Sequence, residues 1–301
     1  MSLRSTTVTS YAECTARQRL ALMLDASSFH EWLPPAERVT SPHLAQLGVP
    51  CAFDDGVAVG RAALEGRSVF VAAQEGAFMG GGVGEVHGAK LVGMLRRAVR
   101  DRPDAVLLLA ESGGVRLHEA NAGLIAVSEV MRALLDVRAS GMPVVVLIGG
   151  ANGCFGGMGI VAACADHVVM SDVGRHAMSG PEVIEASGGV EEFDARDRSL
   201  VWRTTGGKHR YLLGDCDQLV DDDVQAFRAA ATRALDQSRP LTLQALEAEH
   251  RLLSARLAAA HDEADAFELW RRLGITHPEQ VPDRSVRDIG ALVASRPKEA
   301  A

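Results

Sequence analysis

The sequence predicts an α/β protein in which short strands, glycine turns and helices alternate. Two apolar runs, residues 105–109 and 143–148, have the length of buried strands. Each run is followed by a glycine-rich turn and then by a segment with helical spacing. This plan, repeated with short connections, is typical of stacked α/β units and not of a β-sandwich.

The N-terminal part of the chain begins the same plan. Residues 17–24 place apolar side chains at helical spacing, which predicts a helix. Residues 57–74 form two strand-like runs around a Glu-Gly turn, which predicts a β-hairpin. A glycine-dense turn at residues 80–84 then leads into residues 85–100, which have the length of a helix.

The later elements complete the order. We expect helices at residues 119–140 and 158–165, and short strands at residues 167–170 and 176–178. Residues 222–273 are rich in Ala, Leu, Glu and Arg, which predicts two helices that break near Arg239-Pro240 and pack on their own domain. We expect an irregular or partly disordered tail from Pro278 onward.

Three units are expected along the chain. No low-complexity linker interrupts residues 50–235, so this region is expected to be one compact domain. We assign residues 1–15 to a flexible N-terminus, residues 16–250 to the α/β domain, and residues 251–301 to a helical extension and tail.

Charge and cysteine usage exclude several classes of function. The net charge of −8 argues against nucleic-acid and anionic-membrane partners, because both need a concentrated basic face. The five cysteines have no CxxC spacing, so we expect no zinc site and no other metal. We see no signal peptide and no apolar run long enough to span a bilayer. We therefore expect a soluble cytoplasmic protein.

Two glycine turns follow the two buried strands: residues 112–114 (Ser-Gly-Gly, the first turn) and 155–157 (Phe-Gly-Gly, the second turn). A turn before a helix N-terminus exposes backbone N–H groups, and the helix dipole favours negative charge there. Glycine lets a ligand approach these groups closely. We expect both turns to converge on one thioester oxygen and to stabilise an enolate or tetrahedral oxyanion. The alternative is that the glycines only permit tight turns.

The motifs of the chain occur in an order that resembles a known family. Residues 111–116 read Glu-Ser-Gly-Gly-Val-Arg, and they stand between a glycine turn at 81–85 and another at 153–159. In this order they resemble the carboxyltransferase half-domains of acyl-CoA carboxylases, which belong to the crotonase-like superfamily. The resemblance extends from about residue 16 to 250. It implies a crotonase-like (ClpP/crotonase) superhelix of stacked β-β-α units with a helical C-terminal extension.

Three departures from the acetyl-CoA carboxylase subunits favour the malonate decarboxylase branch of this family. The chain lacks their four-cysteine zinc ribbon, His118 replaces a usual glutamine, and Glu182 stands where many relatives have arginine. Residues 202–210 also resemble that branch. Because Glu182 is acidic, a basic pocket contact of the carboxylases is not expected here.

The resemblance implies a reaction and a set of partners. In that branch a malonyl thioester, held on an acyl-carrier subunit by a phosphoribosyl-dephospho-CoA arm, becomes an acetyl thioester and CO2. The half-subunit that this chain resembles pairs with a γ half-subunit that is also crotonase-like, and an α subunit acts as the carrier transferase. No cofactor is expected on this chain itself.

The expected site residues form two groups. Catalytic roles are assigned to Gly113, Gly114, Gly156, Gly157, Arg116 and His118. Contacts with substrate or carrier arm are assigned to Ser112, Gly81, Gly82, Lys90, Phe155, Met158, Ser179 and Gly180. Phe155 and Met158 would give the substrate carboxylate a less polar environment.

Several of these residues have an alternative role. Arg116 is equally expected to orient a carboxylate or to brace Glu111 or Glu119. His118 and His209 are candidate proton donors, although a surface or structural role is the more usual one for each. Two further side chains are expected to be structural or solvated: Cys154 as a small buried residue and Lys208 as a surface lysine.

Two other functions stay open at this point. A carboxyltransferase would pass the carboxyl group to biotin, which would have to bind the partner half-subunit. A non-catalytic scaffold would not need two intact glycine turns, so their presence argues against that role.

Overall fold

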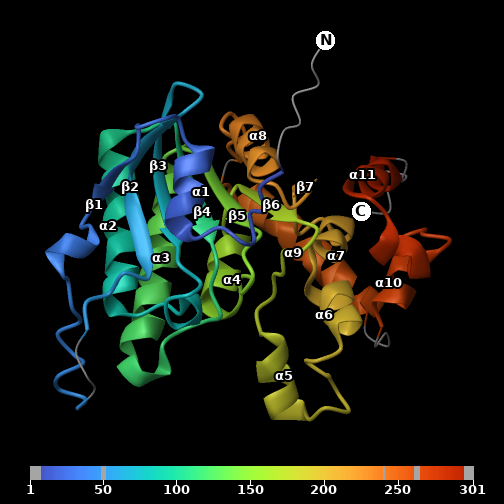
Figure 1. The fold of residues 1–301 in the computed structure, drawn as a ribbon. Helices are drawn as coiled ribbons and strands as arrows, with labels where there is room; N and C mark the ends of the chain where they lie inside the picture. Colours follow the sequence, from blue (N-terminus) through green and yellow to red (C-terminus); the bar gives the residue numbers. More distant parts are fainter. Residues whose placement is uncertain (1–7, 49–51, 240, 261–264, 295–301) are drawn as a thin grey trace.

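A mixed seven-stranded sheet runs through the centre of the molecule (Figure 1). The computed structural model describes residues 8–48, 52–239, 241–260 and 265–294. The strands lie in the sheet in chain order: β1 (His30–Trp32), β2 (Val57–Leu64), β3 (Arg67–Gln74), β4 (Ala105–Ala110), β5 (Val144–Ile148), β6 (His167–Ser171) and β7 (Gln218–Val220). β1, β2 and β3 pair antiparallel, and β3 to β7 pair parallel.

Helices cover both faces of the sheet. One face packs against α2 (Glu85–Asp101), α3 (Ala122–Ala139) and α4 (Gly156–Ala163). The other packs against α1 (Ala16–Met23) and α8 (Val224–Ala234). The two faces alternate along each central strand, as strand geometry requires. In β4, for example, Leu108 points to the α2–α3 side and Leu107 to the α1–α8 side.

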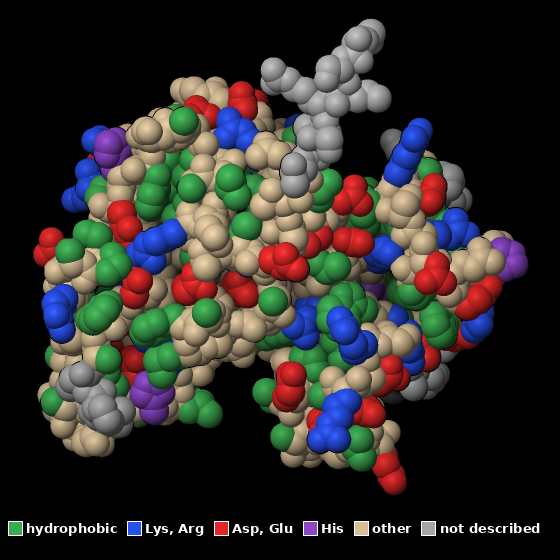
Figure 2. Space-filling model, viewed as in Figure 1, with side chains coloured by type: hydrophobic (Ala, Val, Ile, Leu, Met, Phe, Trp, Pro, Cys, Tyr) green, Lys and Arg blue, Asp and Glu red, His purple; other side chains and the backbone are tan. Residues whose placement is uncertain are grey.

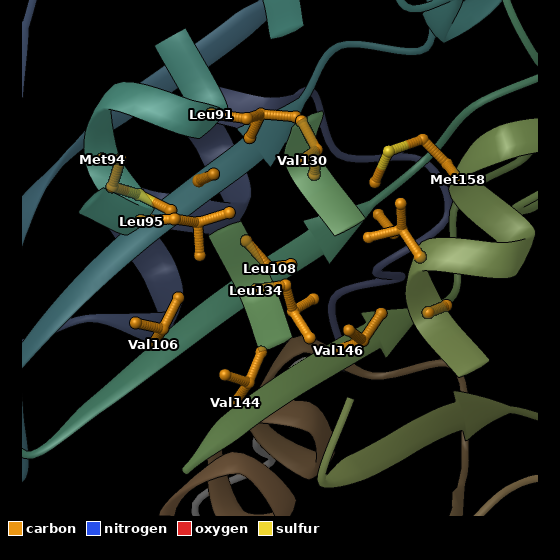
Figure 3. Packing of buried hydrophobic residues seen from close by; sticks show 14 of the residues in the cluster. Leu91, Met94, Leu95, Val106, Leu108, Val130, Leu134, Val144, Val146 and Met158 are labelled. Atoms are coloured by element: carbon orange, nitrogen blue, oxygen red, sulfur yellow. The ribbon is translucent and has the colours of Figure 1, made fainter. Parts of the chain in front are cut away.

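Figure 3 shows the first of these cores at close range. Leu91 and Leu95 from α2 and Leu134 from α3 pack over Leu108 of β4 and Val146 of β5. All five are at most 2% exposed. This packing fixes the start of each helix relative to the end of the preceding strand, and the glycine turns lie at those junctions.

The C-terminal part adds helices around the end of the sheet. These are α5 (Pro181–Gly188), α6 (Arg198–Thr205), α7 (Gly207–Leu213), α9 (Leu243–Ala260), α10 (Ala266–Arg272) and α11 (Val286–Ala294). Trp270 of α10 and Ile289 of α11 are buried in a small separate cluster with Leu212 of α7. This small core is therefore shared between α7 and the helices that follow α9.

Most of the expected elements are confirmed, and three expectations are wrong. Residues 176–178 form no strand, because only His176 makes an isolated bridge, to Cys154. The described residues between 222 and 273 form three helices and not two, and none of the side chains described in α9 is buried. Residues after Pro278 form a short 3₁₀ helix (Pro278–Asp283) and then α11.

The boundaries of the three expected units stay predictions. Residues 1–7 of the expected N-terminus, Pro240 at the expected helix break, and residues 295–301 of the expected tail lie outside the described residues. No helix in the described part of the chain is both long and apolar enough to cross a membrane.

Candidate active site

The first and second turns lie side by side at the carboxyl ends of β4 and β5. These strands are adjacent and parallel, and Ala110 pairs with Ile148 at their ends. The Ser112 N–H donates to the Gly153 carbonyl (2.8 Å), and the Phe155 N–H donates to the Ser112 carbonyl (2.7 Å). Ligands of open α/β sheets bind at this edge, so the placement suits a site.

Gly114 and Gly156 bring the two turns into direct contact. A Cβ added to Gly156 would lie 2.9 Å from the Gly114 Cα. Both residues also have positive φ, +136° at Gly114 and +60° at Gly156. A side chain at Gly156 would push the turns apart, so this contact requires glycine.

Two of the four turn glycines use their N–H groups inside the protein. The Gly113 N–H donates to the Gly80 carbonyl (2.8 Å), and the Gly156 N–H donates to the Met178 carbonyl (2.9 Å). The expectation that all four glycines offer donors to a ligand therefore needs correction. Gly113 and Gly156 hold the turns in place instead.

The other two N–H groups are available. The Gly114 N–H makes only a 3.2 Å bond to the Ser112 Oγ, and the Gly157 N–H has no acceptor among the described residues. Gly157 lies in the first turn of α4, where backbone N–H groups lack intrahelical acceptors and the dipole favours negative charge. Both glycines are partly exposed. Each turn thus offers one donor: Gly157 from the second turn, and Gly114 from the first turn if its bond to the Ser112 Oγ is exchanged for a ligand.

Arg116 braces the first turn from inside the protein. Its guanidinium is buried and makes a two-pronged contact with the Asp54 carboxylate, with Nη2 to Oδ1 at 3.1 Å. It also lies 3.3 Å from the Glu119 Oε1. Because this arginine already has two carboxylate partners, the bracing role is favoured over contact with substrate. Its pairing with Asp54 helps to lower the pKa of that carboxyl group, against the effect of burial.

His118 lies at the surface beside the first turn. Its side chain is 35% exposed, and its Nε2 lies 3.9 Å from the Glu119 Oε1. No contact in the described part of the chain joins it to the second turn. The structure therefore leaves it accessible to a bound ligand without fixing its orientation.

Lys90 does not lie where a carrier arm could reach it easily. It is on the buried face of α2, and its Nζ donates to the Val57 carbonyl (2.5 Å). Burial lowers the pKa of this amine. The assignment of Lys90 to the carrier arm is therefore not supported by its position. The spacing of His87, Lys90, Leu91 and Met94 along α2 is the sequence signal that indicates burial.

Gly81 and Gly82 lie behind the first turn. A Cβ on Gly81 would overlap the Glu111 carbonyl, and one on Gly82 would lie 3.2 Å from the Arg116 side chain. Both glycines thus permit the segment before α2 to pack against the first turn. Both glycines are buried, so their position supports the first turn.

Ser179 and Gly180 follow Met178, whose carbonyl accepts the Gly156 N–H, and so lie beside the second turn. A Cβ on Gly180 would lie 3.9 Å from the Phe155 ring, and the Arg175 guanidinium carbon lies 5.7 Å from the ring centroid. Met158 points from α4 into the core, as Figure 3 shows, and both side chains are buried, Met158 at 2% and Phe155 at 3% exposed. Burial thus argues against direct contact of a carboxylate with either the Phe155 ring or the Met158 thioether, and Phe155 differs only in that it belongs to the second turn itself.

Cys154, Lys208 and His209 take no visible part in the site. Burial raises the pKa of the Cys154 thiol to about 12, which disfavours a thiolate nucleophile. His209 is buried and its Nδ1 accepts from the Trp270 indole (3.1 Å), while Lys208 donates to the Pro282 carbonyl (2.6 Å). Burial lowers the pKa of His209 to about 3, so it is neutral near pH 7.

The sequence reasoning missed two residues that support the turns. Asp54 is the main partner of Arg116, and Asn152 places its backbone N–H 3.1 Å from the Glu111 Oε1. Asn152 also donates from its side chain to the Gly76 carbonyl (2.7 Å). Asn152 could have been found from the sequence, because it is a polar residue within the glycine-rich segment that follows β5. Asp54 comes from a distant loop, and its sequence position gave no such signal. Within the described residues, no cluster of three or more His, Cys, Asp or Glu side chains could hold a metal ion.

The carboxyl transferase domain matches residues 9–243 of this chain. The chain belongs to the carboxyl transferase family. It is therefore an enzyme of that family, and its expected crotonase-like fold is confirmed by its structural relatives.

Three members of the family are similar to it in sequence or structure. A malonyl-S-ACP:biotin-protein carboxyltransferase of Malonomonas rubra is 40% identical over 90% of this chain and 92% of its own length. A Pseudomonas malonate decarboxylase hetero-tetramer, solved with malonate, contains a chain with TM-score 0.78 and 41% identity, covering 86% of this chain and 95% of that one. The propionyl-CoA carboxylase beta chain of Saccharopolyspora erythraea is 32% identical over 68% of this chain and 37% of its own length.

Proposed function

We propose that this family member is the thioester-binding β half-subunit of a malonate decarboxylase. Its substrate would be a malonyl thioester on an acyl-carrier subunit, and its products an acetyl thioester and CO2. The observation that supports this most is the pair of N–H groups on Gly114 and Gly157, one from each of two turns in close contact. The Gly157 N–H has no acceptor among the described residues, and the Gly114 N–H makes only a 3.2 Å bond to the Ser112 Oγ. The likeness to a malonate decarboxylase chain adds independent support.

In the proposed mechanism the thioester carbonyl oxygen accepts from Gly114 and Gly157. The bond between the α-carbon and the carboxylate breaks, and CO2 leaves. The electron pair of that bond forms a C=C bond, and the carbonyl oxygen becomes an enolate oxyanion. A proton from water or from the exposed His118 then adds to the α-carbon and gives the acetyl thioester. Donors placed where charge develops stabilise the transition state more than the ground state.

The carrier arm would bring the substrate without any cofactor on this chain. We propose that a phosphoribosyl-dephospho-CoA group on the acyl-carrier subunit holds the malonyl thioester. Ser179, which is partly exposed near the second turn, and the buried Gly180 that follows it are the proposed contacts for this arm. Glu182 beside them is an exposed acidic residue, which argues for contact through backbone and apolar groups.

A γ half-subunit would complete the site, and an α subunit would act as carrier transferase. Large apolar side chains are exposed next to both turns: Leu117 at 85%, Met178 at 69% and Val183 at 59%. Figure 2 shows a notch in the surface between the lobe formed by α5 and the part of the molecule that contains α3. Exposed apolar surface of this kind favours a protein partner. We propose a cytoplasmic complex, in keeping with the four free cysteines found in the described residues.

A second candidate function is carboxyl transfer to biotin. It is favoured by the 40% identity to a malonyl-S-ACP:biotin-protein carboxyltransferase. In that case the enolate would form in the same way, and the carboxyl group would pass to biotin on the partner half-subunit. The two functions share the first step and differ in the acceptor of the carboxyl group.

The test is to purify this chain with its γ partner and measure acetyl thioester and CO2 formed from the malonyl thioester of the carrier. The assay is run with avidin and without it, and avidin already saturated with biotin is the control. Turnover that avidin does not change supports the decarboxylase. Turnover only in the presence of a biotinylated protein supports the carboxyltransferase. No turnover in either assay would contradict both the decarboxylase and the carboxyltransferase, and it would favour the non-catalytic scaffold.

A further inference from the structure

A buried ion pair lies beneath the two turns. The Arg19 Nη1 donates to the Glu111 Oε2 at 2.5 Å, and the side chains are 1% and 7% exposed. Glu111 immediately precedes the first turn at the end of β4, while Arg19 comes from α1 near the N-terminus. A buried ion pair gives little net stability compared with apolar packing, so stability alone does not explain why this pair is present.

The second oxygen of Glu111 holds the loop before the second turn. The Glu111 Oε1 accepts the Asn152 N–H at 3.1 Å. A Cβ added to Gly76 or to Gly150 would overlap the Glu111 carboxylate, so backbone encloses it on both sides. The Glu111 carboxylate thus links the two turns. Glu111 directly precedes the first turn in the chain, and its side chain contacts the loop before the second turn.

Arg19 is itself anchored at three points. Its Nε donates to the Tyr11 carbonyl (2.9 Å), its Nη2 to the Ala12 carbonyl (3.4 Å), and its guanidinium carbon lies 4.5 Å from the Tyr11 ring centroid. Tyr11 is fully buried and stacks on Phe227 of α8. The cation that holds Glu111 is therefore fixed to the α1–α8 side of the sheet.

We propose that Arg19 and Glu111 are positioning residues that set the distance between the Gly114 and Gly157 donors. This inference rests on the proposed function, because it assigns the pair to the oxyanion geometry of that reaction. Arg19 fixes one oxygen of the carboxylate, and the other oxygen then fixes Asn152 and the loop that leads to Gly157. Displacement of a reacting geometry by about 1 Å can cost roughly a hundredfold in rate.

Glutamine cannot replace Glu111 in this arrangement. Both carboxylate oxygens of Glu111 accept hydrogen bonds, one from Arg19 and one from the Asn152 backbone N–H. A glutamine offers one acceptor and one donor, so one of these two N–H groups would face another N–H. Glu111→Gln thus keeps the volume and removes one of the two ties. Arg19→Met removes the cation, and Arg19→Lys keeps a donor for the carboxylate.

The chain offers a matched control at the opposite ends of the strands. Asp166 is also buried, its Oδ1 lies 3.3 Å from the Arg138 Nε, and its Oδ2 accepts the Val144 N–H (2.9 Å). It precedes β6, far along the sheet from the glycine turns. Its Oδ1 also accepts the Arg239 N–H (2.7 Å), so Asp166→Asn disturbs a similar carboxylate, with an arginine and two backbone partners, and leaves the turns untouched.

The first experiment measures kcat and KM for the malonyl thioester of the carrier with the assembled β–γ complex. We expect Glu111→Gln and Arg19→Met to lower kcat roughly ten- to a hundredfold and to change KM less than about threefold. Arg19→Lys should retain most of the rate, and Asp166→Asn should keep kcat within about twofold. Wild-type kcat in Glu111→Gln and Arg19→Met would overturn the proposal, as would an equal loss in Asp166→Asn.

Hydrogen exchange separates this inference from the proposed reaction. In the assembled complex, Glu111→Gln should speed exchange at the Asn152 and Phe155 amides, and Asp166→Asn should speed it at Val144 instead. If the wild-type complex shows no turnover, the proposed function fails. The exchange rates of these amides still test whether Glu111 positions the second turn. Unchanged exchange at Asn152 and Phe155 in Glu111→Gln would overturn it.

Discussion

At Gly156 two properties of one residue act together. The missing side chain lets its backbone meet Gly114, and its N–H bond to Met178 holds the second turn in that position. The donor left for a ligand belongs to its neighbour, Gly157. Activity should therefore depend on the size of residue 156 more than on any chemical group that it presents.

We predict that Gly156→Ala lowers kcat about a hundredfold while the β–γ complex still assembles. The added methyl would lie 2.9 Å from the Gly114 Cα and separate the two donors, and loss of one oxyanion donor costs about 3 kcal/mol. Steady-state kinetics and gel filtration check both halves of the prediction. Gly93→Ala is the control, since its Cβ would meet open space on α2. Equal kcat in the two variants would show that the added methyl does not separate the two donors.

Sequence alone located the turns but not the free donors within them. The short buried runs that end before residues 112 and 155 placed both turns correctly. Which N–H groups remain free depends on the carbonyls of Gly80 and Met178, and these lie in other loops. Local spacing holds no information about those carbonyls. The same limit applies to Arg116, whose partner Asp54 is distant in sequence.

At the scale of elements, the central strands and helices were predictable because their local and tertiary signals agree. The hairpin of β2 and β3, and α2 after it, follow the apolar spacing closely. The error at residues 176–178 arose because a strand-like pattern there meets a neighbour at a single bridge. The error after Pro278 arose because Ile289 gains its partners from α7 and α10.

The helix α9 has exposed leucines, and we expect them to contribute little to the stability of this chain. Leu253 is 49% exposed and Leu257 is 75% exposed. We predict that Leu253→Ala with Leu257→Ala changes the free energy of unfolding of the isolated chain by less than about 1 kcal/mol. Phe227→Ala on buried α8 is the comparison and should cost about 3–5 kcal/mol. Urea denaturation measures both, and a loss from the α9 pair as large as that from Phe227→Ala would disprove the prediction.

For the whole molecule, buried neutral histidines make folding sensitive to acid. Burial lowers the pKa of His87 and of His209 to about 3, from an ordinary value of 6.5. Between these two pH values the unfolded chain binds protons that the folded chain does not. The stability that these residues contribute is therefore complete above about pH 6.5 and is lost as the pH falls toward 3.

We predict that the free energy of unfolding falls more steeply below pH 6.5 in the wild-type chain than in His209→Gln. The difference in slope should approach about 1.4 kcal/mol per pH unit, which corresponds to one proton. Urea titrations between pH 7 and 5 measure it in a range above the ordinary carboxyl pKa values. Identical slopes for the two proteins would show that His209 is not held neutral in the folded state.

The whole assembly also allows the central claim to be measured directly. That claim is that the Gly114 and Gly157 N–H groups bind the thioester carbonyl oxygen. Hydrogen bonds to a carbonyl weaken its C=O bond, so infrared difference spectra of a 13C-carbonyl acetyl thioester on the carrier report them. We predict a lower stretching frequency in the wild-type β–γ complex than in water, and a return toward the water value in Gly156→Ala. An unshifted frequency in the wild-type complex, or the same shift in both proteins, would contradict the account.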